Sequence, residues 1–449
     1  MPKKPTSQYV CQQCSAIRTK WAGRCDSCGA WNSLVEQPVE PTGASAVASS
    51  HGKALQPSSI TKVEASDQAG RITSGIPDVD SVLGGGIVPA SVMLIAGQPG
   101  IGKSTLLMQL AHKVSLDRKI LYISGEESTG QVKVRATRLG AEHENLHLAS
   151  STSADDIAAT IKQGSYRVVI VDSIQTLAMQ SLSSAPGSVG QITNSSNLLT
   201  QAAKASNTAL ILVGHVTKEG SIAGPKVLEH MVDVVLNLEG DRYGGFKVLR
   251  AIKNRYGSTN EAAIFEMDDS GLVPVANPSA ALLAERVNSD GSVVLATLEG
   301  NRPLLVEIQA LVNKTNFGYP KRAASGFDVN RLSLLVAVLE RRTKLQLSDC
   351  DIYINVVGGI KLQDPAADLA VCMAIASAAK EMALSDDTVV FGEVGLSGEV
   401  RSAPQAEKRI AEAKKLGFKT AIAPRGKQNK FISPVGSMRD ALNAHLKRK

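Results

Sequence analysis

The sequence has few aromatic residues and no long apolar run, and each shortage excludes a class of protein. Phenylalanine, tyrosine and tryptophan make up only 4% of the 449 residues, so any cores are aliphatic. No run of 18 or more apolar residues occurs, which excludes a membrane-spanning helix. The basic start, Met1–Lys4, leads into polar residues rather than an apolar signal core. We therefore expect a cytoplasmic protein with no membrane partner.

Positive charge is in small excess over negative charge. There are 49 Lys and Arg residues against 42 Asp and Glu residues, which gives a net charge of +7. This balance permits nucleic-acid binding without demonstrating it. The length itself predicts about two to four domains.

Cysteine is scarce, and its distribution points to a metal. The chain has six cysteines, four of them in two C-x-x-C pairs near the start. Each pair forms a tight turn that directs two thiolates to one point, and two pairs complete a tetrahedral zinc site. Two disulfides are the alternative, which a reducing compartment disfavours. The predicted Zn²⁺ ligands of this ribbon, residues 1–36, are Cys11, Cys14, Cys25 and Cys28.

The only two tryptophans, Trp21 and Trp31, flank the second cysteine pair. We expect them to form the small core of a module that needs metal to fold, with stacking on nucleic acid as the alternative. Residues 37–59 are rich in Pro, Ser, Ala, Gly and Thr without apolar periodicity, so they are predicted to be a flexible linker. The ribbon is then tethered rather than packed against the next domain.

The most informative stretch, Val92–Leu107, is typical of a buried strand, a glycine turn and a helix start. It contains G-x-x-x-x-G-K-S, the phosphate-binding loop, in which backbone N–H groups and the helix N-terminus face a phosphate chain. Lys103 would reach the β and γ phosphates, and Ser104 would hold Mg²⁺. A glycine turn without a ligand is the alternative. The predicted ATP or ADP contacts are Gly97, Gln98, Pro99, Gly100, Ile101, Gly102, Lys103, Ser104 and Thr105.

Residues 60–280 alternate apolar runs with helical patterns, which predicts a parallel α/β sheet covered by helices. The predicted strands are Val92–Ala96, Ile120–Ile123, Val168–Val171, Ala209–Val213 and Val232–Leu238, with added strands at Phe246–Ile252 and Ala262–Phe265. The pattern restarts near Leu282, so residues 281–449 are predicted to be a second α/β domain.

Two acidic positions follow these strands. Asp172 ends an apolar strand, and in phosphate-loop enzymes such an aspartate lies beside the loop and orders the Mg²⁺ shell. Glu126 and Glu127 follow the strand after the loop's helix, and we prefer Glu126 as the carboxylate that activates water. The alternative is that both acids are the acidic start of the next helix.

Two further segments carry candidate residues. His215 follows a strand and could sense the γ phosphate, although a scaffold role is equally compatible. Lys253 and Arg255 lie two residues apart after a strand and would project to the same side. They could stabilise charge on a neighbour's nucleotide, contact DNA phosphates, or simply form a solvated turn.

The combination of motifs resembles one protein family. Residues 74–87, SGIPDVDSVLGGGI, followed by the phosphate loop, are similar to the opening of RecA-type ATPase cores. Together with the four-cysteine ribbon, the KNRYG segment at Lys253–Gly257 and a Lon-like C-terminal domain, they resemble the RadA (Sms) family of bacterial recombination and repair ATPases. The resemblance covers essentially the whole chain.

That resemblance implies a DNA-dependent ATPase that binds single-stranded and branched DNA, works with the RecA recombinase and promotes branch migration. It also implies a homohexameric ring with nucleotide between subunits, which favours roles for Lys253 and Arg255 across the interface. The protein would associate with the nucleoid when on DNA. DNA would contact loops near Gln180–Gly190 and Lys218–Lys226, whose composition supports mobility better than it supports contact.

The C-terminal domain departs from Lon-type proteases at its reactive positions. Ala366 stands where the nucleophilic serine would be, and the lysine position falls on Glu407, with Lys408 adjacent. Alanine has no nucleophilic atom, so the domain is predicted to be proteolytically inactive, a scaffold for ring formation and DNA binding. Its basic residues could contact phosphates or be solvated surface; they include Lys314, Lys321, Arg322 and Lys344.

The reading from sequence is therefore an ATP-hydrolysing DNA motor. A nucleotide-switched adaptor that binds DNA and recruits RecA without translocating is the main alternative, because an intact phosphate loop and Glu126 suit both. An ATP-dependent protease is a weaker alternative, which Ala366 opposes.

Overall fold

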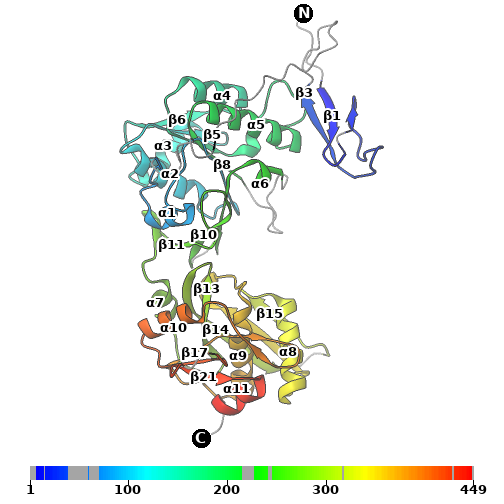
Figure 1. Ribbon diagram of the computed structural model, residues 1–449, viewed down its shortest axis with the longest axis vertical. Helices are drawn as coiled ribbons and strands as arrows, with labels where there is room; N and C mark the ends of the chain where they lie inside the picture. The colour runs from blue at the N-terminus through cyan, green and yellow to red at the C-terminus, as the bar shows by residue number, and fades with distance from the viewer. Residues whose placement is uncertain are drawn as a thin grey trace, which may run out of the picture. The chain divides into compact units, whose positions relative to one another are not determined.

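In the computed structural model the chain divides into two compact units, both of them α/β (Figure 1). The described residues are 7–14, 16–38, 59, 70–214, 227–240, 245–315, 318–426 and 429–446. The first unit comprises Met1–Leu238, Leu249–Thr259 and Asp268–Leu272, and the second comprises Glu239–Val248, Asn260–Met267 and Val273–Lys449. Among the described helices, none is both long enough and apolar enough to cross a membrane.

The N-terminal ribbon is a three-stranded antiparallel sheet. Its strands β1 (Ser7–Cys11), β2 (Ile17–Arg18) and β3 (Leu34–Pro38) lie in the order β2-β1-β3. The buried apolar centre consists of Cys11, Cys25 and Leu34. This centre is too small to support a fold without further bonds, which is why a metal is needed.

The first unit is built on a parallel sheet whose strand order is β9-β4-β8-β7-β5-β6. Every residue of β4, β5, β7 and β8 is buried, as expected of strands covered on both faces. The strands are β4 (Val92–Gly97), β5 (Ile120–Ser124), β6 (Leu146–Ser150), β7 (Val168–Asp172), β8 (Ala209–Val213) and β9 (Val234–Gly240). All five predicted parallel strands are confirmed, and β6 is an addition.

Helices connect these strands and cover the sheet. Helices α4 and α5 pack on each other and share one apolar cluster with the strands, centred on residues such as Ile157 and Leu199. The helices are α1 (Pro77–Leu83), α2 (Lys103–Ser115), α3 (Thr129–Arg138), α4 (Ala154–Gln163), α5 (Val189–Ala205) and α6 (Val227–Met231). The strands that follow in the chain are β10 (Lys247–Asn254), β11 (Ala262–Asp268) and β12 (Gly271–Pro274).

The ribbon contacts the first unit's helical layer through Glu36 of β3. Its carboxylate accepts hydrogen bonds from the Ser183 hydroxyl (2.6 Å) and backbone N–H (3.4 Å). Its carbonyl oxygen accepts one from the Asn194 side chain at 3.2 Å. The expectation of a ribbon that is only tethered is therefore wrong. The composition of the linker could not predict the hydrogen bonds that Glu36 forms outside the linker.

The second unit is built on a seven-stranded mixed sheet in the order β15-β16-β14-β13-β17-β20-β21. A long antiparallel pair, β13 and β14, forms its middle. Strand β16 pairs antiparallel with β14, β15 pairs parallel with β16, and β17, β20 and β21 extend the β13 side in parallel. The strands are β13 (Ser292–Glu299), β14 (Arg302–Lys314), β15 (Arg322–Ser325), β16 (Cys350–Val356), β17 (Thr388–Val390), β20 (Thr420–Pro424) and β21 (Ile432–Val435), with the small pair β18 (Glu393–Val394) and β19 (Val400–Arg401) beside them.

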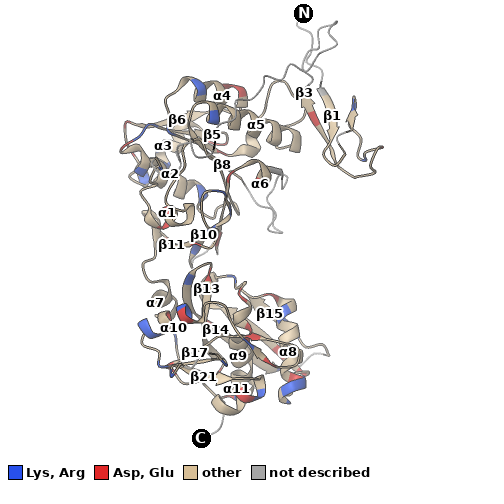
Figure 2. Cartoon of the chain, viewed as in Figure 1, with Lys and Arg blue, Asp and Glu red and all other residues tan. Residues whose placement is uncertain are grey.

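The central helix of this unit, α9 (Asp368–Lys380), packs on β13 and β14. It is buried from Asp368 to Ser377, which its small residues allow because they keep a helix thin on all sides. The remaining helices are α7 (Pro278–Leu283), α8 (Val329–Thr343), α10 (Ala406–Lys415) and α11 (Met438–His445). Among the described residues, Lys and Arg are interspersed with Asp and Glu along both units (Figure 2).

Candidate nucleotide, magnesium and zinc sites

The phosphate loop leaves β4 at Gly97 and enters α2 at Lys103. A Cβ on Gly97 would lie 2.5 Å from the carbonyl oxygen of Leu238, so only glycine fits. Gly102 caps α2 with φ 112°, a backbone conformation that favours glycine. The loop therefore has the tight turn and helix N-terminus that anion binding requires.

Lys103 lies inside this loop. Its buried ammonium donates to the carbonyl oxygens of Gly97 at 2.8 Å and Gln98 at 3.1 Å. Burial lowers the pKa of Lys103 to about 8, against the opposing influence of Asp172 and Glu126. Both carboxylates are therefore close enough to act on the lysine, so three predicted site residues meet at one edge of the sheet.

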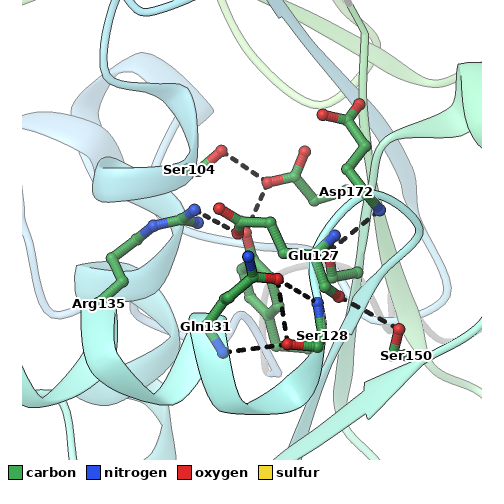
Figure 3. Close-up of polar contacts among 10 residues, drawn as sticks. Ser104, Glu127, Ser128, Gln131, Arg135, Ser150 and Asp172 are labelled. Carbon is green, nitrogen blue, oxygen red and sulfur yellow. Dashed lines mark hydrogen bonds and ion pairs between the residues drawn. The ribbon is translucent and has the colours of Figure 1, made fainter.

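Asp172, at the end of β7, receives two hydroxyl groups on one oxygen. Ser104 donates to Asp172 Oδ2 at 2.6 Å (Figure 3). Tyr122 donates to the same oxygen, also at 2.6 Å. In the sheet, β8 separates β7 from β4, and α2 carries Ser104 across that gap. A hydroxyl and a carboxylate are hard oxygen donors, the kind that Mg²⁺ takes, so the residues present fit the predicted metal.

Tyr122 was not among the predicted site residues. It belongs to β5 and is only 1% exposed, and its burial and the neighbouring Asp172 raise its pKa well above the usual value. The raised pKa keeps the phenol protonated, which its hydrogen bond to Asp172 requires. Within an apolar strand, the sequence pattern indicates that a tyrosine is a core residue. Only its hydroxyl, which needs a hydrogen-bond partner when buried, could have indicated a role at the site.

Glu126 and Glu127 point to different partners. The Ser173 hydroxyl donates to Glu126 Oε1 at 2.6 Å, which ties this carboxylate to the residue after Asp172. Glu127 forms an ion pair with Arg135 of α3 (Figure 3). Both acids precede the helix, because Ser128 is the N-cap of α3 and forms a capping box with Gln131.

The segment with Lys253 and Arg255 is firmly held. Lys253 Nζ donates to the carbonyl oxygens of Glu229 (2.8 Å) and Val232 (2.7 Å), and burial lowers its pKa. Arg255 donates to Asp233 at 3.1 Å. Both cations thus reach the same segment, residues 229–233, and these contacts show Lys253 is not part of a freely solvated turn.

The four ribbon cysteines converge as the spacing predicts. Their sulfur atoms all lie within 4.8 Å of one another, with Cys11–Cys28 and Cys14–Cys25 both at 3.6 Å. Tetrahedral Zn–S bonds of about 2.3 Å need sulfur atoms about 3.8 Å apart, so the donor set fits Zn²⁺. All four are thiols rather than disulfides.

The predicted role of the tryptophans is wrong. Trp21 and Trp31 are 59% and 73% exposed, and the ribbon centre is formed by cysteines and Leu34 instead. Both indole edges lie within 4.0 Å of the point where a Cβ of Gly23 would stand, and Arg24 lies over Trp31 at 5.8 Å. The spacing of the tryptophans around the second cysteine pair does not determine whether their side chains face the core or the solvent.

The Lon-like positions hold no nucleophile. Ala366 is 1% exposed, Glu407 is exposed, and Lys408 Nζ lies 3.5 Å from the carbonyl oxygen of Asn301. Buried Arg409 instead binds Asp364 at 2.6 Å, and this carboxylate also caps Ala366 N–H at 3.0 Å. An ion pair and a short helical turn occupy this region.

The other predicted contacts have varied placements. Arg322 donates to the carbonyl oxygens of Leu347 and Cys350, so it is a structural residue rather than a free phosphate contact, whereas Lys314, Lys321 and Lys344 are exposed. The loop 180–190 carries the Glu36 contact at Ser183. His215 and Lys218–Lys226 lie outside the described residues.

Comparisons with known proteins agree with this architecture. Family models match residues 9–36 ("Rubredoxin metal binding domain"), 57–221 ("AAA domain") and 333–427 ("Subunit ChlI of Mg-chelatase"). "DNA repair protein RadA" of Bacillus subtilis (strain 168) is 47% identical over 438 residues, 96% of this chain and 95% of that protein. The protein of the same name from Pseudomonas aeruginosa is 48% identical, covering 96% of each chain.

The chain belongs to the RadA family of DNA repair proteins. "DNA repair protein RadA" of Aquifex aeolicus is also similar, at 44% identity over 98% of this chain and 99% of that protein. Membership of the RadA family assigns the three parts as a zinc ribbon, a RecA-like ATPase core and a Lon-like domain. A chain described as "Crystal structure of the RadB recombinase" aligns at 21% identity over 45% of this chain with a TM-score of 0.38, too low to support an argument.

Proposed function

We propose that this chain is a DNA-dependent ATPase of homologous recombination and repair. One observation carries the proposal: Lys103, the Ser104–Asp172 pair and the Glu126–Ser173 pair meet at the carboxyl edge of a parallel sheet. This edge is where open α/β sheets bind ligands. The AAA-domain match and the DNA repair relatives support the same activity.

Each residue of the proposed nucleotide site has a separate role in phosphoryl transfer. The loop Gly97–Thr105 binds the phosphates, and Lys103 exchanges its carbonyl partners for phosphate oxygens. Ser104 and Asp172 would hold Mg²⁺, which supplies charge neutralisation at the β and γ phosphates when bound. Glu126, held by Ser173, orients and deprotonates the attacking water.

Lys253 and Arg255 are proposed to act on the nucleotide of a neighbouring subunit. Their described contacts run to residues 229–233 of their own chain, and Arg255 keeps a side chain that is 57% exposed. An exposed guanidinium on a fixed turn suits an arginine finger, which stabilises charge in the transition state. We infer a homohexamer with nucleotide between subunits, in keeping with the RadA resemblance.

The remaining parts of the proposal concern partners. The protein would bind single-stranded and branched DNA, act with the RecA recombinase and promote branch migration, in the cytoplasm and on the nucleoid. Residues 1–36 would form the zinc ribbon, 60–280 the ATPase domain and 281–449 an inactive Lon-like scaffold. Resemblance supports these points.

The test is ATP hydrolysis with and without single-stranded DNA for wild type, Lys253→Ala and a control, Lys133→Ala. Lys133 pairs with Glu142 on the surface of α3, so its loss removes an equal charge away from the site. We expect strong DNA stimulation in wild type and control, and its loss in Lys253→Ala with DNA binding retained. Loss of DNA binding would instead assign Lys253 to the DNA path.

A nucleotide-switched adaptor is the second candidate. The same site geometry suits a protein that binds ATP, changes shape and recruits RecA without moving along DNA. Absence of DNA stimulation in wild type would reject the motor and favour the adaptor. A protease is opposed by the alanine at position 366 and its buried surroundings.

A further inference from the structure

Asp172 Oδ2 accepts two hydroxyl hydrogen bonds, and only one of them comes from the phosphate loop. Ser104 donates from the first turn of α2, and Tyr122 donates from β5, the strand next to β7, each at 2.6 Å. Hydrogen bonds of this length to a carboxylate are among the strong ones. One oxygen of the carboxylate is thus held by two donors from different elements.

The two donors come from different elements. Ser104 lies in the first turn of α2, beside the loop that would take up the nucleotide, whereas Tyr122 is 1% exposed within a fully buried strand. Its backbone is paired with β7 in register, Tyr122 opposite Ile170, two residues before Asp172. The phenol therefore holds Asp172 relative to the sheet rather than relative to the loop.

We propose that Tyr122 is a positioning residue for magnesium: its hydroxyl orients Asp172 so that the carboxylate serves both Ser104 and the cation. A hydroxyl that binds a metal must direct its proton elsewhere, and Asp172 Oδ2, 2.6 Å from Ser104 Oγ, is the acceptor for that proton. Tyr122 keeps that acceptor in place. The inference rests on the proposed nucleotide site and deepens it.

The alternative is that Tyr122 is merely a core residue whose hydroxyl needs a partner. The two readings differ in what the phenylalanine variant changes. A structural residue affects the stability of the fold, whereas a positioning residue affects the Mg²⁺ concentration at which nucleotide binds.

The experiment compares wild type with Tyr122→Phe by titrating Mg²⁺ against a fluorescent ADP analogue, with thermal unfolding measured in parallel. We expect the half-saturating Mg²⁺ concentration to rise about tenfold, the range expected for one hydrogen bond to a charged group. Binding of the analogue in EDTA should stay unchanged. An unchanged Mg²⁺ dependence, with or without a lower melting temperature, would overturn the proposal.

Tyr166→Phe is the matched control. Tyr166 lies in the same unit, and its ring packs edge-on against His147 at 5.5 Å, away from Asp172. Removing its hydroxyl should leave the Mg²⁺ titration unchanged. If Tyr122→Phe does not fold, p-fluorophenylalanine at position 122 fills the volume of the hydroxyl without a donor, and an unchanged Mg²⁺ dependence of that variant would overturn the proposal.

The binding readout separates this inference from the proposed function. If the wild type binds nucleotide with Mg²⁺ but does not hydrolyse it, the proposed ATPase activity is rejected. The Mg²⁺ titration of Tyr122→Phe would still test the positioning role of Tyr122. A wild type that hydrolyses ATP, alongside a Tyr122→Phe variant with unchanged Mg²⁺ dependence, would reject only the role of Tyr122.

Discussion

Arg255 donates a hydrogen bond of 3.1 Å to the buried carboxylate of Asp233, and the other oxygen of that carboxylate accepts the backbone N–H of Val92 at 3.0 Å. Val92 is the first residue of β4, the strand that carries the phosphate loop. One carboxylate therefore joins the proposed finger to the start of the strand beneath the nucleotide. Arg71 supports the same turn by donating to the carbonyl oxygen of Tyr256 at 2.8 Å.

Replacing Asp233 should destabilise the first unit. Asp233→Ala leaves the Val92 N–H without its acceptor and Arg255 without its ion pair, so we expect a loss of about 2 kcal/mol in the free energy of unfolding. Urea unfolding measures it. Asp117→Ala, at an exposed acid in the same unit, is the control. Equal stability of the two variants would contradict the prediction.

Nucleotide binding should take up a proton at alkaline pH. Burial lowers the pKa of Lys103 to about 8, and a bound phosphate chain raises it by stabilising the ammonium. The affinity is therefore fully present below about pH 8 and falls as pH rises through that value. Calorimetry of ADP binding in two buffers of different ionisation enthalpy should show proton uptake near pH 9 and little near pH 7.5. Buffer-independent heats at both pH values would contradict this.

The two adjacent glutamates should differ sharply in function. Glu126→Gln removes the proposed base, so we expect kcat to fall by about 10²- to 10⁴-fold with nucleotide binding retained. Glu127→Gln weakens only the pair with Arg135 and should hydrolyse ATP near the wild-type rate, with a slightly lower melting temperature. The reverse ranking would assign the base to Glu127.

Metal removal should loosen the ribbon alone. Each chain is expected to hold one Zn²⁺ by native mass spectrometry, and Cys25→Ser should abolish it, because Cys25 is fully buried among the ligands. Protease should then cleave within residues 7–38 while 70–214 stays intact. Cys350→Ser, outside the cluster, is the control and should keep its zinc. Zinc retained by Cys25→Ser would refute the ligand assignment.

The glycine and lysine spacing was sufficient to predict the phosphate loop, and apolar runs predicted the fully buried strands. Strand β6 was missed because its residues, Leu146–Ser150, are only half buried and lack a continuous apolar run. The C-terminal edge strands β15 and β21 likewise lack a continuous apolar run, since edge strands are short and mixed in polarity.

Contacts between distant side chains could not be predicted in this way. The Tyr122–Asp172 bond spans 50 positions, and the Glu36–Ser183 bond spans 147, so neither leaves a local pattern. The same limit explains Arg322, whose charge predicts a phosphate contact but whose guanidinium holds backbone carbonyl groups. Tertiary geometry decided each of these cases.

The exposed pair Trp21 and Trp31 has an optical consequence. These are the only tryptophans among 449 residues. Fluorescence excited at the red edge of the indole band therefore comes from the ribbon alone, because the ATPase and Lon-like parts contain no tryptophan. Because both rings face solvent, they respond to whatever covers them. Emission from the unlabelled chain can therefore follow any partner that approaches the ribbon during ATP turnover.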